Sequence, residues 1–135
     1  MFEQVCLNGD GASIIIDFPY EKHGDDKKWV NLNICIKIGE FIGKIFPMFH
    51  LSDLELFEKA LRSALSSTRA KFENMEDDIK LEFVTSSQGA IQIIGAIKYL
   101  SNAQASLAFD FFTDHEALKS FLASISKLLS RHKND

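Results

Sequence analysis

The chain has 135 residues, and we expect one domain spanning residues 1–135 because that length is typical of a single hydrophobic core. Hydrophobic residues make up 46% of the sequence and charged residues 25%, values that exclude disordered and fibrous classes. Fifteen basic residues against 19 acidic ones leave a net charge of -4, which argues against nucleic acid as a direct ligand and favours a basic partner.

The N-terminus has no basic start followed by an apolar run, and no stretch is long enough to span a bilayer. Cys6 and Cys35 are the two cysteines, too few for a disulfide framework or a zinc ribbon. We therefore expect a cytoplasmic protein that has no contact with a membrane.

Residues 29–38 alternate strictly between apolar and polar side chains, which predicts a half-buried strand with Val30 to Ile38 on its core side. Gly39-Glu40 predicts a type II′ hairpin turn, because glycine readily takes the positive φ of the first turn position. The return strand should place alternate residues from Phe41 to Phe49 on the core side, with Pro47 marking an edge or a bulge.

Ser52 and Glu55 have the spacing of a capping box, so a helix should begin there and end near residues 66–68. Alternation then predicts strands over residues 79–83, 90–100 and 107–111, separated by turns at 86–89 and 101–104. Thr113 and Glu116 repeat the capping box and predict a closing helix that ends near residue 132.

The expected fold class is α+β, with a mainly antiparallel sheet of about six or seven strands and two amphipathic helices packed on one of its faces. The order strands-helix-strands-helix suggests two similar halves, and at an offset of 61 residues Ser52 aligns with Thr113 and Leu61 with Leu122. A duplication and a simple recurrence of capped amphipathic helices both explain this match. The uncovered sheet face would carry a mixture of aromatic, amide and charged side chains: Trp29, Asn31, Asn33, Lys44, Phe46, Met48, Glu82 and Gln92.

The sequence contains none of the patterns that carry catalysis. No Gly-x-Ser-x-Gly elbow or phosphate-binding Gly-Lys-Ser/Thr motif is present, and the four histidines have no His-x-x-x-His spacing. We expect no catalytic residues, no metal site and no cofactor.

The densest charge cluster consists of Glu73, Glu76, Asp77 and Asp78. Its position in a polar connection is typical of solvated surface, and its alternative role is a docking patch for a basic partner. Trp29 and Phe46 are candidate aromatic anchors for the same partner. Simple packing at the end of the sheet is the competing interpretation of Trp29.

Several motifs follow one another from Trp29 to the end of the chain, over about four fifths of its length: Trp29 before an alternating strand, Gly39-x-Phe41-x-Gly43, Leu54 and Phe57, Ala70-x-Phe72-x-x-Met75-Glu76, Gly89-x-Ile91-x-Ile93-x-Gly95, Leu107-x-Phe109 and Thr113-Asp114. In this order they resemble the WapI-type immunity proteins, a family encoded beside polymorphic bacterial toxins, including contact-dependent growth-inhibition toxins.

The resemblance implies a cytoplasmic immunity protein that neutralises a cognate secreted toxin by stoichiometric binding. The expected partner is a basic nuclease, and the immunity protein is expected to block its active site. A monomer or a weak homodimer is expected. Two alternatives stay open at this point. One is a small ligand-binding protein or enzyme whose acids from Glu73 to Asp78 border a cleft, and the other is a self-associating structural module that uses the open sheet face or edge strands.

Overall fold

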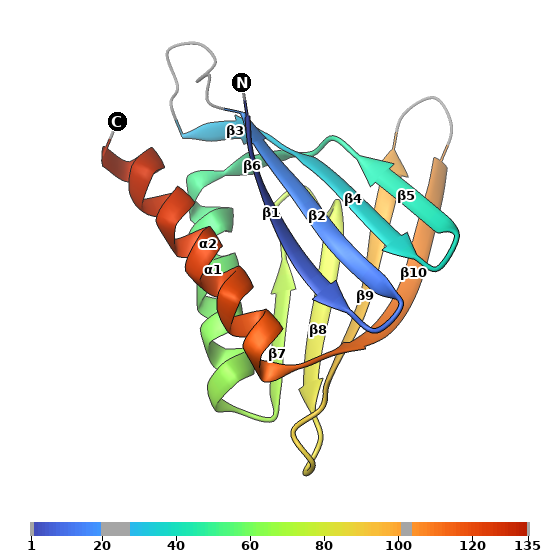
Figure 1. Cartoon of the computed structure of the whole chain (residues 1–135). Coiled ribbons are helices and arrows are strands. Elements are labelled where there is room, and N and C mark those ends of the chain that lie inside the picture. The colour runs from blue at the N-terminus through green and yellow to red at the C-terminus, as the bar shows by residue number, and fades with distance from the viewer. Residues whose placement is uncertain (1, 20–27, 101–103, 135) are drawn as a thin grey trace.

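The computed structural model describes residues 2–19, 28–100 and 104–134. Within these ranges the chain folds into ten strands and two helices in the order strands-helix-strands-helix (Figure 1). The predicted α+β class and the order of its elements are thus confirmed. Residues 101–103 of the predicted turn at 101–104 lie outside the described ranges.

The first half contains six strands and one helix: β1 (Phe2–Gly9), β2 (Ala12–Pro19), β3 (Trp29–Asn31), β4 (Asn33–Ile38), β5 (Phe41–Ile45), β6 (Met48–His50) and α1 (Leu51–Ser66). The second half contains four strands and one helix: β7 (Arg69–Glu73), β8 (Ile79–Thr85), β9 (Ile91–Leu100), β10 (Gln104–Thr113) and α2 (His115–Asn134).

All strand pairs are antiparallel, but the strands form more than the one sheet that the sequence predicts. Four strands of the first half lie in the order β1-β2-β4-β5, and those of the second half in the order β10-β9-β8-β7. The short strands β3 and β6 pair separately. The single predicted strand over residues 29–38 is divided at Leu32, because β3 leaves the first sheet to pair with β6.

The two four-stranded sheets lie one behind the other, and their inner faces share one core with the helices (Figure 1). Helix α1 packs on β7 and β8, α2 packs on β1, and the two helices pack on each other. The prediction that both helices cover one face of one sheet is therefore wrong. Helix α2 packs on the first sheet at its edge strand β1, and α1 packs on the second sheet at its edge strand β7. The two helices contact each other between these edges.

On the opposite side of the molecule the sheets contact each other directly (Figure 1). Gly43 of β5 lies so close to β10 that an added Cβ would come within 2.7 Å of Leu107. Phe41, which the alternation places on the core side, is 73% exposed. It begins β5 at the hairpin end, next to the Gly39-Glu40 turn, where a groove opens toward β9 and β10.

The Gly39-Glu40 turn agrees with the predicted type II′ turn, which requires a positive φ at its first central residue and a negative φ at its second. Gly39 has a φ of 57°, and the φ of Glu40 is not positive.

Both helices begin at residues other than the predicted caps. His50 is the N-cap of α1, since its Nδ1 accepts the Ser52 N–H at 3.1 Å and its own N–H donates to Asp53 Oδ2 at 2.9 Å. Pairing of His50 with Trp29 keeps the chain extended up to residue 50, so the helix begins at Leu51. The predicted box of Ser52 and Glu55 is therefore wrong.

In α2 the cap is Asp114, whose Oδ1 accepts the Ala117 N–H at 2.7 Å. Thr113 instead donates its hydroxyl to the Asn8 carbonyl at 2.7 Å, which joins β10 to β1. Aligned by their caps, the helices match at an offset of 64 residues, with Leu54 opposite Leu118 and Phe57 opposite Phe121, all buried. This replaces the offset of 61 residues found in the sequence.

Neither described helix has the length and apolar composition that crossing a membrane would need.

Candidate functional site

The four candidate acids lie together where β7 turns into β8. We call residues 73–78 the acidic turn. Asn74, which is only 4% exposed, holds this turn from inside. Its Oδ1 accepts the N–H groups of Asp78 at 2.8 Å and Ile79 at 3.0 Å, and its Nδ2 donates to Asp78 Oδ2 at 2.9 Å. One buried amide therefore fixes the return of the chain into β8.

Asp53 of α1 braces the same turn from outside it. Its side chain is 1% exposed, and its Oδ1 accepts the Met75 N–H at 2.8 Å while Oδ2 caps the helix. A buried carboxylate is stable only when hydrogen bonds replace its water, and here both oxygens have backbone donors. The start of α1 and the acidic turn are thus joined as one rigid unit.

Trp29 belongs to this unit through His50. The two rings make an edge-on contact with centroids 4.9 Å apart and an interplanar angle of 75°. His50 in turn donates its N–H to Asp53. The structure therefore connects Trp29 to the acidic turn through His50 and Asp53, and Trp29 is half-buried.

Phe46 lies elsewhere, in the link between β5 and β6, and is 71% exposed. Within the described ranges no hydrogen bond, ion pair or ring contact connects it with the acidic turn. The structure thus separates the candidate aromatic anchors, with Trp29 near the acids and Phe46 apart from them.

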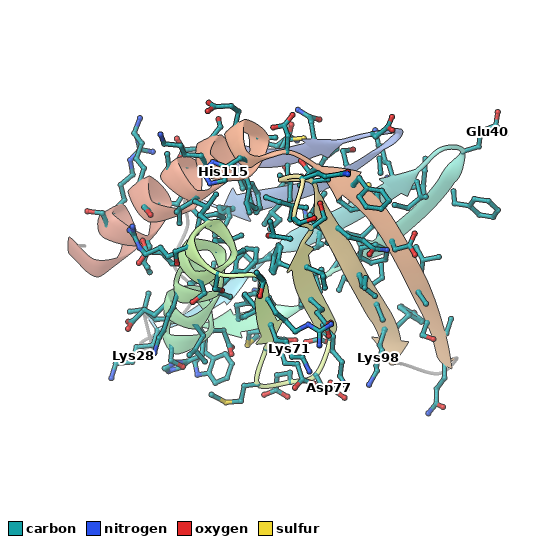
Figure 2. All side chains as sticks on the ribbon, turned by 90° about the horizontal axis from the view of Figure 1, so that it is seen from below. Lys28, Glu40, Lys71, Asp77, Lys98 and His115 are labelled. Atoms are coloured by element: carbon teal, nitrogen blue, oxygen red, sulfur yellow. The ribbon has the colours of Figure 1, made fainter. Side chains whose placement is uncertain are left out.

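Three of the four acids are held by partners within the chain. Glu73 pairs with Lys80 at 3.1 Å, Asp77 receives a hydrogen bond from Lys98 at 2.6 Å, and Asp78 is bonded to Asn74. Figure 2 shows Asp77 and Lys98 on the outer face of the second sheet. The hydrogen bond from Lys98 lowers the pKa of Asp77, and the hydrogen bond to Glu73 raises the pKa of Lys80.

Glu76 is different because it is exposed and, among the described residues, forms no ion pair or side-chain hydrogen bond. Met75 beside it is 62% exposed, although its backbone is fixed by Asp53. Asp77 has a φ of 59°, which is rare for a residue other than glycine and is maintained here by the surrounding bonds. The turn therefore presents a methionine and an unpaired carboxylate on a rigid backbone.

Sequence reasoning missed Asp53, Asn74 and Met75. Asn74 before a run of acids is typical of a turn residue, and Asp53 in the first turn of a helix is a common reciprocal cap, so both had a local signal. Their contact across the fold had none, because Asp53 and Met75 are 22 residues apart.

The two cysteines cannot form a disulfide bond with each other. Both flank Ile15 on the outer face of the first sheet, about 10 Å apart across two strand spacings, which is too far for a disulfide bond. Burial raises the pKa of the Cys6 thiol, with a smaller opposing effect of Lys37. Within the part of the chain that the structure describes, no three His, Cys, Asp or Glu side chains are arranged to hold a metal ion.

Comparison with known proteins gives one family match, over residues 6–133. No protein of curated function matches the chain. A solved structure described as "Crystal structures of trypanosoma bruciei MRP1/MRP2" is similar with a TM-score of 0.48 and 10% identity, covering 97% of this chain and 82% of that one. A likeness at that level carries no argument. The family match does, since it spans nearly the whole chain: the protein belongs to the WapI-like immunity protein family, whose members are non-enzymatic toxin inhibitors.

Proposed function

We propose that this immunity protein neutralises a cognate nuclease toxin by stoichiometric binding that covers the toxin's active site. Nuclease active sites are basic because they bind phosphates, and a protein of net charge -4 would be attracted to one. Neutralisation would take place in the cytoplasm of the producing cell, before the toxin reaches nucleic acid.

We place the toxin contact at the acidic turn. The observation that carries this proposal is the exposed carboxylate of Glu76, which has no partner among the described residues, on a turn fixed by Asn74 and Asp53. A rigid turn loses little conformational entropy on binding, so more of its interaction energy appears as affinity. Met75 supplies apolar contact area next to the charge.

The other acids have supporting roles in this proposal. Glu73, Asp77 and Asp78 add negative potential, although Lys80 and Lys98 offset part of it. Trp29 would flank the contact, because its ring packs on His50, which is bonded to Asp53 beside the turn. Phe46 would make a separate apolar contact. Long-range attraction from such groups mainly raises the association rate, whereas buried anchors slow dissociation.

The test is a titration of the toxin domain encoded beside this gene with purified immunity protein, following nucleic-acid cleavage. We expect loss of activity at one equivalent. Glu76→Lys should weaken inhibition by about tenfold to a hundredfold, because a repelling charge replaces an attracting one at the contact. Met75→Ala should weaken it through faster dissociation.

Glu116→Lys is the matched control. Glu116 is an exposed carboxylate in the first turn of α2, remote from the acidic turn in sequence, and its reversal changes the net charge by the same two units as Glu76→Lys. Full inhibition by both Glu76→Lys and Met75→Ala would place the contact elsewhere. Inhibition of a toxin that acts on something other than nucleic acid would refute the nuclease assignment alone.

A further inference from the structure

Strand β5 has a free edge. It is the last strand of the β1-β2-β4-β5 sheet, and it lies on the side of the molecule opposite the helices (Figure 1). The other edge strand, β1, packs against α2. Within the described ranges, no backbone hydrogen bond joins the outer edge of β5 to another segment. Such an edge leaves unpaired N–H and C=O groups that can pair with another strand.

The hairpin geometry identifies the groups that point outward. Ile38 pairs with Phe41 across the two-residue turn, so these flanking residues form a hydrogen-bonded pair. Alternate residues Gly43 and Ile45 also bond to β4, and the backbone groups of Ile42 and Lys44 therefore point to the free edge.

The side chains on this edge are apolar and exposed, with Phe41 73% and Ile42 58% exposed. Native edge strands are usually protected by charge, proline or a covering element. Lys44 is the one charged residue within β5, and Glu40 precedes the strand in the turn. Among the described residues, neither Glu40 nor Lys44 forms an ion pair.

We propose that β5 pairs antiparallel with β5 of a second copy of this chain, in the register that places Ile42 opposite Ile42. The two first sheets then form one continuous sheet across the dimer axis. In this register Glu40 lies beside Lys44 of the second copy, and the two-fold axis repeats that pair. The edge is thus complementary to itself in charge.

The same register places Phe41 opposite Gly43 of the second copy. These residues form a non-hydrogen-bonded pair, the kind in which side chains of neighbouring strands are closest. Gly43 must be small because Leu107 and Ile97 occupy the space of a Cβ, at 2.7 Å and 3.0 Å. Phe41 of the second copy would therefore pack beside the Leu107 and Ile97 side chains that fill this space.

Neighbouring registers lack these pairings. Centring the contact on Lys44 would place two lysines directly opposite each other, which is destabilising. Centring it on Gly43 would place Lys44 opposite Ile42 and leave Glu40 without a cation. Charge therefore selects the Ile42 register.

The dimer leaves the proposed toxin contact accessible and does not depend on it. Figure 2 shows Glu40 at the outer tip of the hairpin, well separated from Asp77 of the acidic turn. The contact is limited to one edge strand of five residues in each copy. Small contacts are typical of weak association, so we expect a dissociation constant in the micromolar range.

Sedimentation equilibrium of variants with single charge reversals tests the proposal. The protein concentration should run from about 1 μM to 1 mM, a range that spans the expected micromolar dissociation constant. Glu40→Lys and Lys44→Glu should each weaken dimerisation at least about tenfold, because both attracting pairs become repelling pairs. Mixing the two variants should restore association as a heterodimer, in which all four charges are paired with opposite charges. The double variant E40K/K44E should dimerise like the natural chain.

Circular dichroism and thermal unfolding check that each exposed substitution leaves the fold intact. A natural chain that stays monomeric up to 1 mM would overturn the proposal, as would a dimer that is unaffected by either single reversal or is not restored by mixing. Loss of toxin inhibition in Lys44→Glu without any dimer in the natural chain would assign the edge to the toxin instead. Toxin inhibition through Glu76 is measured separately, so failure of one proposal leaves the other standing.

Discussion

The carboxylate of Asp53 accepts the backbone N–H of Met75 at 2.8 Å and also caps the helix in which it lies. A single buried side chain therefore fixes both the start of α1 and the tip of the acidic turn. Any change at Asp53 should consequently affect stability and toxin binding together.

Asp53→Asn should lower the free energy of unfolding by about 1–3 kcal/mol. The asparagine amide supplies one oxygen acceptor where the carboxylate supplies two, so either Met75 or His50 loses the acceptor of its N–H. Urea unfolding measures the loss. Asp114→Asn is the control, because Asn caps a helix as well as Asp does and the described structure gives this exposed side chain no second backbone donor. Equal stabilities for the two variants would contradict the bracing role.

Asn74→Ala should cost about 1–3 kcal/mol, because the Asp78 and Ile79 N–H groups lose their side-chain acceptor and Ile79 lies in the buried core. It should also weaken toxin inhibition beyond the effect of partial unfolding, since the turn would no longer be preorganised. Titration of the toxin at a temperature where the variant is fully folded separates the two effects. Undiminished inhibition there would show that the rigidity of the turn is not used.

Local patterns in the sequence predicted the elements far better than their assembly. The β4–β5 hairpin, β8 to β10 and both helices follow from alternation, turn glycines and helical periodicity. The N-terminal hairpin was not predicted, although it carries the same signal, since Val5 and Leu7 alternate before Asp10-Gly11, and Ile14 and Ile16 alternate after it. Its place beside β4 is set by tertiary pairing, which no local pattern encodes.

The shifted helix caps have the same origin. Ser52 is the better N-cap by intrinsic preference, but pairing of β3 with β6 holds His50 extended and moves the helix start. At the candidate site the acids are clustered in sequence, so Glu73 to Asp78 could be found from the chain alone. Which of them is free could not, because Lys98 reaches Asp77 from a strand 21 residues away.

Gly95→Ala tests the packing between β9 and its neighbours. An added Cβ would lie 2.5 Å from Cζ of Phe109 and 2.8 Å from Cδ2 of Leu81. Overpacking of this kind costs about 1–3 kcal/mol, which thermal unfolding would detect. Phe109→Leu removes the clashing ring edge, so the double variant should lose less stability than the sum of the two single variants. Strict additivity would show that the glycine is not constrained by Phe109.

The ion pair of Asp77 with Lys98 predicts a pH dependence with a definite sign. The hydrogen bond from Lys98 lowers the pKa of folded Asp77 below its usual value of 3.8, so the folded state binds the proton less tightly than the unfolded state. The stabilisation is therefore complete above pH 3.8 and is lost as the pH falls through the lower pKa of the folded state.

Asp77→Asn removes this contribution while tolerating the positive φ of 59°. The difference in unfolding free energy between the natural chain and this variant should be constant near neutral pH and shrink as the solution is acidified below pH 3.8. A difference that grows on acidification would contradict the assigned role of Lys98.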